Sequence, residues 1–491
     1  MSLLRRLTSL LAVAALAIPA LLAQTSAPAP GELTLEACVR RALEKNFDLE
    51  AQQFTTQIAK EGIDVARGAY LPSLNLTSNR ADSQTTAIPG VLSSSSTSSS
   101  TTTASITQPL YTGTTVGLSS QLARSRIDPA ISALNPAYNA DITLTVRQQL
   151  LQGFGIAANK AALLRARVGL AKANLDYRSV AMNVIQSTEN AFYNLVFARE
   201  QLDVLKSSLA LAQRLLDEAQ TRRTTGVATD LDVLQAEVGV ANARRNVLLA
   251  DQTVKNSEEA LLALIGQFEL GTRVGSTHFM EVDEAIPVLA SSFSAAKRSQ
   301  PDYLSAQAAI EQAKYDVTVA RDAAKPSLSV GGAVGLDGHR GSNTDAFNDA
   351  FNNRSNSWQV DLSLTYAWGQ VSQKARLHQS VATLHQQQSR LRQLEQNLEV
   401  QVRSAVRAVE TNAESVKIST QAKILSERQY ALEKAKFDAG LSTSYLVLQA
   451  QNTLETARVA ELQSKVSLRN ALTALHRIEG SSLQQYAVNL P

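Results

Sequence analysis

The sequence has little cysteine, few aromatic residues and almost no excess of charge. Its 491 residues include one cysteine and 5% aromatic residues, and 47 Lys and Arg nearly balance 44 Asp and Glu. A single cysteine excludes a disulfide scaffold, and without a basic block there is no support for nucleic-acid binding. With 44% hydrophobic residues, the composition is that of an ordinary folded protein.

Proline is also scarce, and two long stretches of the chain contain none. None of the twelve prolines lies between residues 136 and 287 or between residues 326 and 491. Because proline breaks helices, these stretches allow unusually long ones. The segment from Ile156 to Arg222 has one glycine and that from Gln370 to Ala439 has none. As a helix, the first would be about 100 Å long.

The second of these segments has a heptad pattern. Apolar residues recur every seven positions, with one step of four, at Leu377, Leu384, Leu391, Leu398, Val402, Val409 and Val416. Such a pattern is typical of helices that pack side by side as in a coiled coil.

The chain begins with the features of a secretory signal. Arg5 and Arg6 precede an apolar run over residues 7–22, and Ala20 and Ala23 approximate the small-residue pattern of a cleavage site. Residues 1–23 are therefore predicted to be a signal peptide. No later window holds 18 apolar residues, so a membrane-spanning helix is not expected. Cys38 lacks the small residues of a lipidation site before it, and a buried thiol is preferred to a lipid anchor.

The rest of the chain contains two related copies. A shift of 254 residues superposes residues 65–67 and 72–74 on residues 319–321 and 326–328, and a shift of 214 superposes Val233-Leu234-Gln235-Ala236 on Val447-Leu448-Gln449-Ala450. The predicted organisation is a linker at 24–32, structural repeat 1 at 33–266, a connector at 267–290, structural repeat 2 at 291–480 and a tail at 481–491.

Each copy is predicted to open with a helix and continue with strands. The helices are expected near residues 33–68 and 293–325, and Pro72 and Pro326 end them. Apolar residues then alternate with polar ones, most clearly from Trp358 to Trp368. A soluble sandwich would alternate in the same way. The two tryptophans, however, are ten residues apart, roughly the 25 Å height of the apolar band of a transmembrane barrel.

These aromatic residues predict a membrane girdle made of Trp358, Tyr366 and Trp368. The polar segment from Leu336 to Ser357 is then predicted to be an exterior loop.

Both long helices are predicted to end in the same turn. Glycine is expected in a left-handed cap, and a threonine three residues later caps the returning helix. Because VLQA follows at the same place in both copies, we predict that the two hairpin tips bind a partner. The tip residues are Gly226, Val227, Thr229, Gly440, Leu441 and Thr443.

The order of these features resembles the TolC-like outer-membrane efflux proteins, over about residues 33–480. The segment from Gln149 to Gly155, QLLQGFG, is similar to the family's QPLLxGFG motif at the end of a barrel strand. The resemblance implies a mixed α and β fold. In it, a homotrimer shares one transmembrane β-barrel, with about four strands per protomer, continued by a long periplasmic α-helical barrel.

The resemblance also implies partners and a location. The hairpin tips would dock a periplasmic adaptor protein and an inner-membrane transporter, and the barrel would contact outer-membrane lipid. An acidic residue six positions after the tip glycine would narrow the periplasmic aperture. Asp232 matches that position, with Asp230 beside it, whereas Leu446 occupies it in the second copy.

The first copy carries 40 extra residues between Pro72 and Gly155, including an almost pure Ser/Thr run from Ser93 to Thr103. Such a tract is expected to be a loop. The segments 102–110 and 114–122 fit either a taller exterior hairpin or two further barrel strands, and the exterior hairpin is our prediction.

No feature of the sequence predicts an enzyme. It has no Cys pair, phosphate-binding loop or nucleophile elbow, so no catalytic, cofactor-binding or metal-binding residue is expected. His378 and His385 would be about 10 Å apart along a helix, too far to share a metal. The predicted function is a passive export duct opened by its partners, in a tripartite efflux or type I secretion system. The alternative is a non-conducting coiled-coil tether of the envelope.

Overall fold

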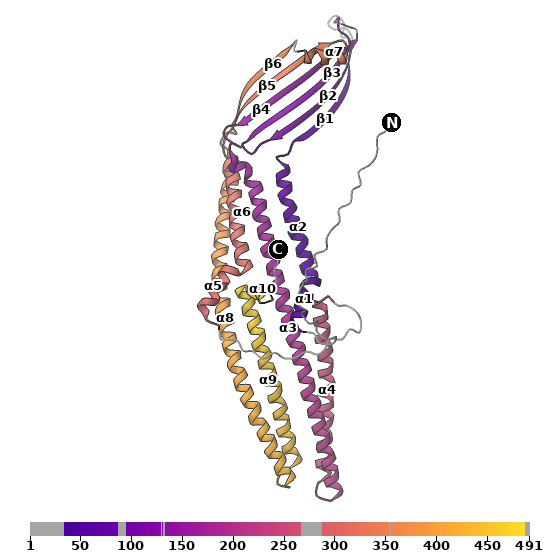
Figure 1. Ribbon diagram of the computed structural model, residues 1–491, viewed down its shortest axis with the longest axis vertical. Helices are drawn as coiled ribbons and strands as arrows, with labels where there is room; N and C mark the ends of the chain where they lie inside the picture. Colours follow the sequence, from indigo (N-terminus) through magenta and orange to yellow (C-terminus); the bar gives the residue numbers. More distant parts are fainter. Residues whose placement is uncertain are drawn as a thin grey trace, which may run out of the picture.

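The computed structural model describes residues 34–86, 95–128, 130, 133–266, 287–352 and 355–486. A curved sheet lies at one end, and long helices run from it to two hairpin tips at the other (Figure 1). The predicted signal peptide and linker lie outside the described residues, as do most of the connector and part of the tail. Among the described helices, none has a window apolar enough to cross a membrane.

The two long helices form as the sequence predicts. α3 runs over Ile156–Thr224 and α8 over Val371–Asp438, and each returns through a shorter helix, α4 (Asp230–Leu264) and α9 (Ser444–Glu479). The heptad residues of α8 face its neighbours, with Leu398, Val402 and Val409 at most 2% exposed. They pack against α9 in an apolar cluster. The predicted seam is therefore a packing seam between helices.

Each copy opens with two helices rather than the single helix expected. The first copy has α1 (Leu35–Lys45) and α2 (Phe47–Gly68), and the second has α5 (Leu289–Ser299) and α6 (Pro301–Ala323). Asn46 and Gln300, which are 254 residues apart, cap the second helix of each pair by accepting hydrogen bonds from Asp48 N and Tyr303 N. These caps, with proline at the first position of α6, break the expected helix.

Six strands form one antiparallel sheet, in the order β1-β2-β3-β4-β5-β6. Their bounds are Ser73–Thr85, Ser95–Pro109, Thr114–Asp128, Ala137–Gln149, Ser327–Arg340 and Asn356–Thr365. The expectation of about four strands per protomer is therefore wrong for this chain. The two additional strands are β2 and β3, which come from the 40-residue insertion.

The insertion is a pair of full-length strands, so the predicted exterior hairpin and Ser/Thr loop are also wrong. β2 pairs with β1 from Thr107 to Ser95, and β3 pairs with β4 along its length. The turn between β2 and β3 lies at the helix end of the sheet, where Gln149 N donates to Gly113 O (3.1 Å). A Ser/Thr run makes a strand here because threonine is β-branched and both neighbouring strands offer partners.

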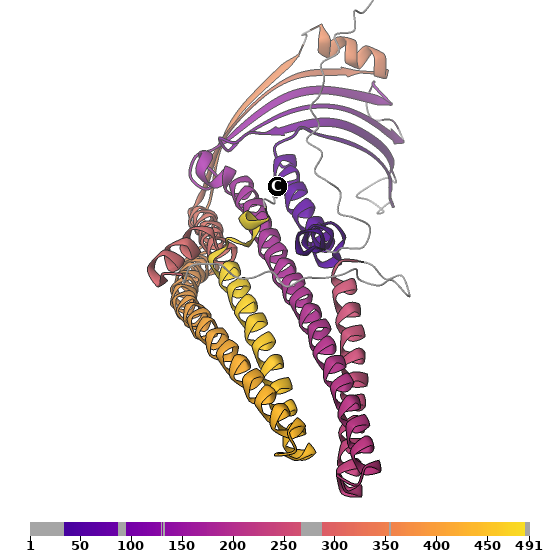
Figure 2. The same ribbon diagram turned by 60° about the horizontal axis from the view of Figure 1, so that its bottom comes forward.

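The predicted exterior loop contains a helix, and the last strand is shorter than expected. β5 extends to Arg340, and α7 (Asn343–Phe351) follows and packs on β4 and β5. Figure 2 shows α7 on the convex side of the sheet. β6 ends at Thr365, so Tyr366 and Trp368 lie in the connection to α8, with their ring centroids 6.2 Å apart. The glycine turn after Trp368, where Gly369 has φ +78°, ends the strand pattern.

The largest apolar cluster lies midway along the helices, between α1, α3 and α4. Phe192, Tyr193, Leu195 and Leu261 belong to it, together with Cys38. Cys38 is fully buried, and burial raises the pKa of its thiol to about 12. The prediction of a buried thiol is confirmed, and this thiol is held in its unreactive protonated form.

Candidate functional site

The first hairpin tip is a tight turn closed by backbone and side-chain caps. Gly226 has φ +75° and donates to Arg223 O (3.0 Å), which ends α3 in the predicted left-handed cap. Thr229 caps α4 and Asp232 completes a capping box, because Thr229 N donates to Asp232 Oδ2 (2.9 Å) and Asp232 N donates to Thr229 Oγ1 (3.3 Å). Val227 is 76% exposed at the end of the molecule.

The second tip repeats the backbone of the first but lacks half of its cap. Gly440 has φ +76° and donates to Phe437 O (3.0 Å). Thr443 accepts a hydrogen bond from Leu446 N (3.4 Å). The leucine side chain has no acceptor for the backbone N–H of Thr443, so the capping box is incomplete. Leu441 is 80% exposed, like Val227 at the first tip. The two tips therefore present similar apolar ends on differently capped helices.

Asp232 and Asp230 have different partners. Asp232 accepts from Thr229 Oγ1 (2.7 Å) and, with its other oxygen, from Ser444 Oγ of the second hairpin (3.3 Å). Hydrogen bonds from the Thr229 side chain and backbone lower the pKa of Asp232 below its usual range. Asp230 instead pairs with Arg223 (2.6 Å) and is 82% exposed. Asp232 thus links the two hairpins, whereas Asp230 stays on the first.

Two contacts between the hairpins were not predicted from the sequence. The guanidinium of Arg222 lies 3.9 Å from the centre of the Phe437 ring and donates to Phe437 O (3.2 Å). Lys434 pairs with Glu218 (3.2 Å) one turn further from the tip. Because these residues are unlike in the two copies, no repeat signal marks them. These two contacts join the C-terminal end of α3 to the C-terminal end of α8.

The two VLQA motifs divide between a core and a groove. Val233 and Ala236 are buried within the first hairpin, and Val447 and Ala450 are also buried, Val447 against Phe437 of α8 and Leu215 of α3. The Leu and Gln residues between them line a groove of about 910 Å³ between α4 and α9. This division follows from the helix period, because residues three apart share a face. The repeated motif therefore builds both the hairpins and the surface between them.

A row of exposed apolar side chains crosses all six strands. Successive strand pairings join Leu74, Ile106, Leu118, Leu144, Val334 and Trp358. Each of them is between 46% and 79% exposed. An uninterrupted exposed apolar row of this kind is typical of a lipid-facing wall. Trp358 lies on this face as predicted, and Trp368, 95% exposed, lies below it in the connection to α8.

The other face of the sheet is polar. Arg147 pairs with Asp361 across β4 to β6 (3.1 Å), and Asp141 lies opposite Asp337. The same face of β2 and β3 carries hydroxyl, amide and small side chains and no charged ones: Thr97, Ser99, Thr101, Thr103, Ser105, Thr107, Thr115, Gly117, Ser119, Gln121, Ala123 and Ser125. The charges of this face are therefore unevenly distributed along the sheet.

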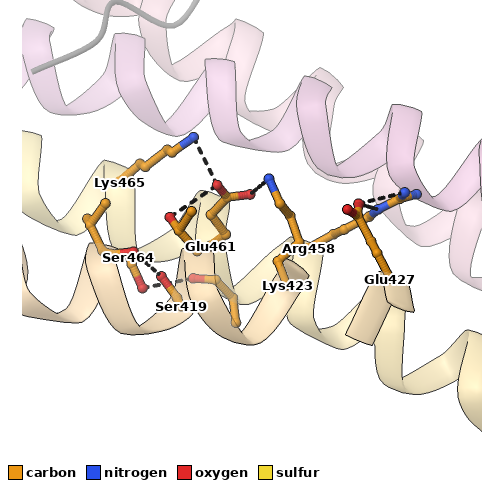
Figure 3. A network of polar contacts seen from close by, with 10 residues as sticks. Ser419, Lys423, Glu427, Arg458, Glu461, Ser464 and Lys465 are labelled. Atoms are coloured by element: carbon orange, nitrogen blue, oxygen red, sulfur yellow. Dashed lines mark hydrogen bonds and ion pairs between the residues drawn. The ribbon is translucent and has the colours of Figure 1, made fainter. Parts of the chain in front are cut away.

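A polar network runs along the seam between α8 and α9 (Figure 3). Glu461, 8% exposed, pairs with Lys423 (2.9 Å) and Lys465 (3.2 Å). Burial would raise the pKa of Glu461, but hydrogen bonds and charges of the two lysines outweigh it and lower that pKa. Arg458 pairs with Glu427 (3.0 Å) further along. This network joins α8 and α9 over the part of the second hairpin that contains residues 423–427 and 458–465.

The described residues contain no group of three His, Cys, Asp or Glu side chains arranged for a metal ion. His378 and His385 are both exposed on α8.

A protein-family model described as "Outer membrane efflux protein" matches residues 38–139, 115–267 and 293–481. The chain is 22% identical over 459 residues to the pyoverdine export outer membrane protein OpmQ of Pseudomonas aeruginosa, covering 92% of this chain and 86% of that protein. It is 23% identical over 319 residues to the outer membrane protein TolC of Escherichia coli, covering 62% and 64%.

Solved structures show the same fold. The outer-membrane channel OprN superposes with a TM-score of 0.69 at 18% identity, covering 91% of this chain and 90% of that one. CusC superposes with a TM-score of 0.69 at 16% identity, covering 91% and 92%.

Proposed function

Because the chain belongs to the outer membrane efflux protein family, whose members are outer-membrane channels, we propose that three copies form one continuous export duct. The sheets would close a shared β-barrel in the outer membrane, and the hairpins would form a helical barrel in the periplasm. The repeats at 33–266 and 291–480 would each supply one hairpin to that barrel. Cargo would move passively through the duct, with energy supplied by a partner.

The apolar row across the six strands is the observation that carries this proposal. The exposed apolar side chains of this row are suited to contact with lipid, and the polar face opposite is suited to a water-filled lumen. Six strands are too few to close a barrel, which needs about eight or more. Among the described strands, β1 and β6 each pair on one side only. Pairing of β1 with β6 of a neighbouring copy would remove both open edges, as a membrane requires.

The hairpin tips and the groove between α4 and α9 support a docking role. Val227 and Leu441 are exposed apolar residues at the end of the molecule, and the groove places Leu234 and Leu448 beside polar amides. A periplasmic adaptor with helical hairpins of its own would fit such a groove, because an amphipathic helix binds in one. The inner-membrane transporter would then meet the opening that the tips surround.

Asp232 and Asp230 are proposed to surround the periplasmic aperture. In a trimer, three copies of Asp232 would converge near the tips, and their charges would favour cations. The hydrogen bond from Ser444 to Asp232 would keep the two hairpins of one protomer together in the closed form.

Light scattering and bilayer recordings test this function together. Detergent-extracted protein should be a trimer that conducts ions in planar bilayers, whereas the tether alternative conducts in no state. Asp232→Asn should weaken the preference for cations, and Asp230→Asn should weaken it less, because Asp230 is paired with Arg223. A monomer, or a trimer that does not conduct, would contradict the proposed export duct. Unchanged ion selectivity in the Asp232 variant would contradict only the proposed role of Asp232 at the aperture.

A further inference from the structure

The insertion of the first copy lies inside the sheet and not at its edge. β1 pairs with β2 and β4 pairs with β3, and β1 has no contact with β4 in the sheet order. Any wall that contains β1 and β4 must therefore contain β2 and β3 as well. An appended hairpin would instead have left β1 beside β4.

The turn between β2 and β3 is built into the junction between the sheet and the helices. Gly155 N donates to Thr112 O (3.1 Å), and a side chain at Gly113 would meet Gly153 O at 2.0 Å. Tyr111 stacks on Tyr70 at the end of α2, with ring centroids 4.2 Å apart. The ammonium group of Lys160, near the start of α3, also lies 4.7 Å from the centre of the Tyr111 ring. The turn between the inserted strands thus contacts the chain at the end of α2 and the start of α3.

The inserted strands continue the apolar row of one face and add to the polar surface of the other. Ile106 and Leu118 stand in the exposed apolar row between Leu74 and Leu144. On the other face, β2 and β3 have no charged residue, whereas β4 to β6 carry Arg147, Asp141 and further charges. The insertion therefore continues the apolar row on one face and adds an uncharged, hydroxyl-rich stretch toward the lumen.

We propose that this insertion widens the outer-membrane outlet to 18 strands, so that it passes bulky hydrophilic cargo. The proposal rests on the trimeric duct above, because three six-stranded sheets give that number. Barrel diameter grows about linearly with strand number, so the lumen is about 1.5-fold wider than one made from three four-stranded sheets. The inserted strands make up a third of its strands, and their side toward the lumen is uncharged and rich in hydroxyl groups, which hydrogen-bond to polar cargo without selecting by charge.

Polymer exclusion measures the width of the barrel lumen directly. Graded polyethylene glycols are added to the exterior side of trimers in planar bilayers, where entry into the barrel does not depend on the periplasmic aperture. The matched variant lacks residues 95–128, which leaves β1 joined to β4 in the correct antiparallel direction. We expect the full chain to admit polymers with a radius about 1.5-fold larger than the variant admits. Equal exclusion limits in two conducting trimers would overturn the wide outlet and leave the duct intact.

Cysteine labelling tests the placement without removing any strand. Ser105 and Ile106 are neighbours on opposite faces of β2, and the single natural cysteine is buried. In outer-membrane vesicles, Ser105→Cys should react with a charged maleimide, whereas Ile106→Cys should be protected by lipid. Equal reaction of both variants would place β2 in water on both faces and overturn the proposal. Electron microscopy of the trimer should then count 18 strands, and a count of 12 would also overturn it.

Discussion

The two helical hairpins have the same backbone plan but are stabilised in different ways. In the second hairpin the buried Glu461 pairs with the half-buried Lys423, whereas the positions 214 residues earlier hold Val247 and Leu209. Val247 packs against the largest apolar cluster. At the tips the difference is reversed, because the first hairpin has the acidic cap residue and the second has leucine. A repeated backbone thus does not require repeated side-chain chemistry.

The largest effect is expected from breaking the ion pairs of the second hairpin. Glu461→Ala leaves Lys423 and Lys465 without their shared carboxylate and should cost about 2–4 kcal/mol of unfolding free energy. This is less than for fully buried ions, because the two lysines are 26% and 32% exposed. Denaturant unfolding followed by circular dichroism measures the loss.

The first hairpin supplies a matched control. Lys423→Leu with Glu461→Val transfers its apolar pair into the second hairpin and should recover at least half of that loss, because an apolar pair avoids the desolvation of buried charges. A double variant as unstable as Glu461→Ala would show that the two hairpins do not have interchangeable cores.

Substitution of the tip glycine should have the same effect on stability in both hairpins. Gly226→Val and Gly440→Val each place a β-branched residue at φ near +75° and should cost about 1–2 kcal/mol. Neither site has a neighbouring atom within 4 Å of an added Cβ, so only backbone strain acts. The double variant should remain trimeric yet lose export in a complementation assay. Asparagine, which tolerates this conformation, should cost less.

Substitutions at the helix caps of the two tips should have opposite effects on stability. Asp232→Ala removes half of the first capping box and its hydrogen bond to Ser444, for a loss of about 1 kcal/mol. Leu446→Glu should instead complete a box at the second tip and add about 0.5 kcal/mol, because Thr443 already caps that helix. Thermal unfolding of the two variants should therefore shift in opposite directions, and a shift in the same direction would contradict the comparison.

The smallest effect is a dependence on pH confined to the first tip. Hydrogen bonds from Thr229 lower the pKa of folded Asp232 below that of the unfolded chain, about 3.9. Its stabilisation is therefore complete above that value and is lost as the pH falls through the lower folded pKa. Because the carboxylate is near the surface, the gain is a few tenths of a kcal/mol. The stability difference between the wild type and Asp232→Asn should shrink from pH 7 to pH 3.

Local signals in the sequence predicted much of the fold. The lack of proline predicted α3 and α8 to within two residues at their ends, and Gly226 and Gly440 marked both turns. The VLQA motif marked the tips as special, but its division between core and groove became visible only with α4 and α9 side by side. The contact between Arg222 and Phe437 joins residues 215 positions apart without any shared pattern, so it was not foreseen.

The sequence alone determined the elements with a strong period or a strict backbone requirement: the long helices, the glycine turns, the heptad seam and the alternating faces of β5 and β6. Only the tertiary structure decided the place of the insertion. A Ser/Thr tract has too few apolar residues to indicate a strand, and it becomes one when β1 and β3 supply hydrogen-bond partners on both sides. The same holds for Asp232, whose partner Ser444 comes from the other hairpin, because such pairings depend on which segments pack together.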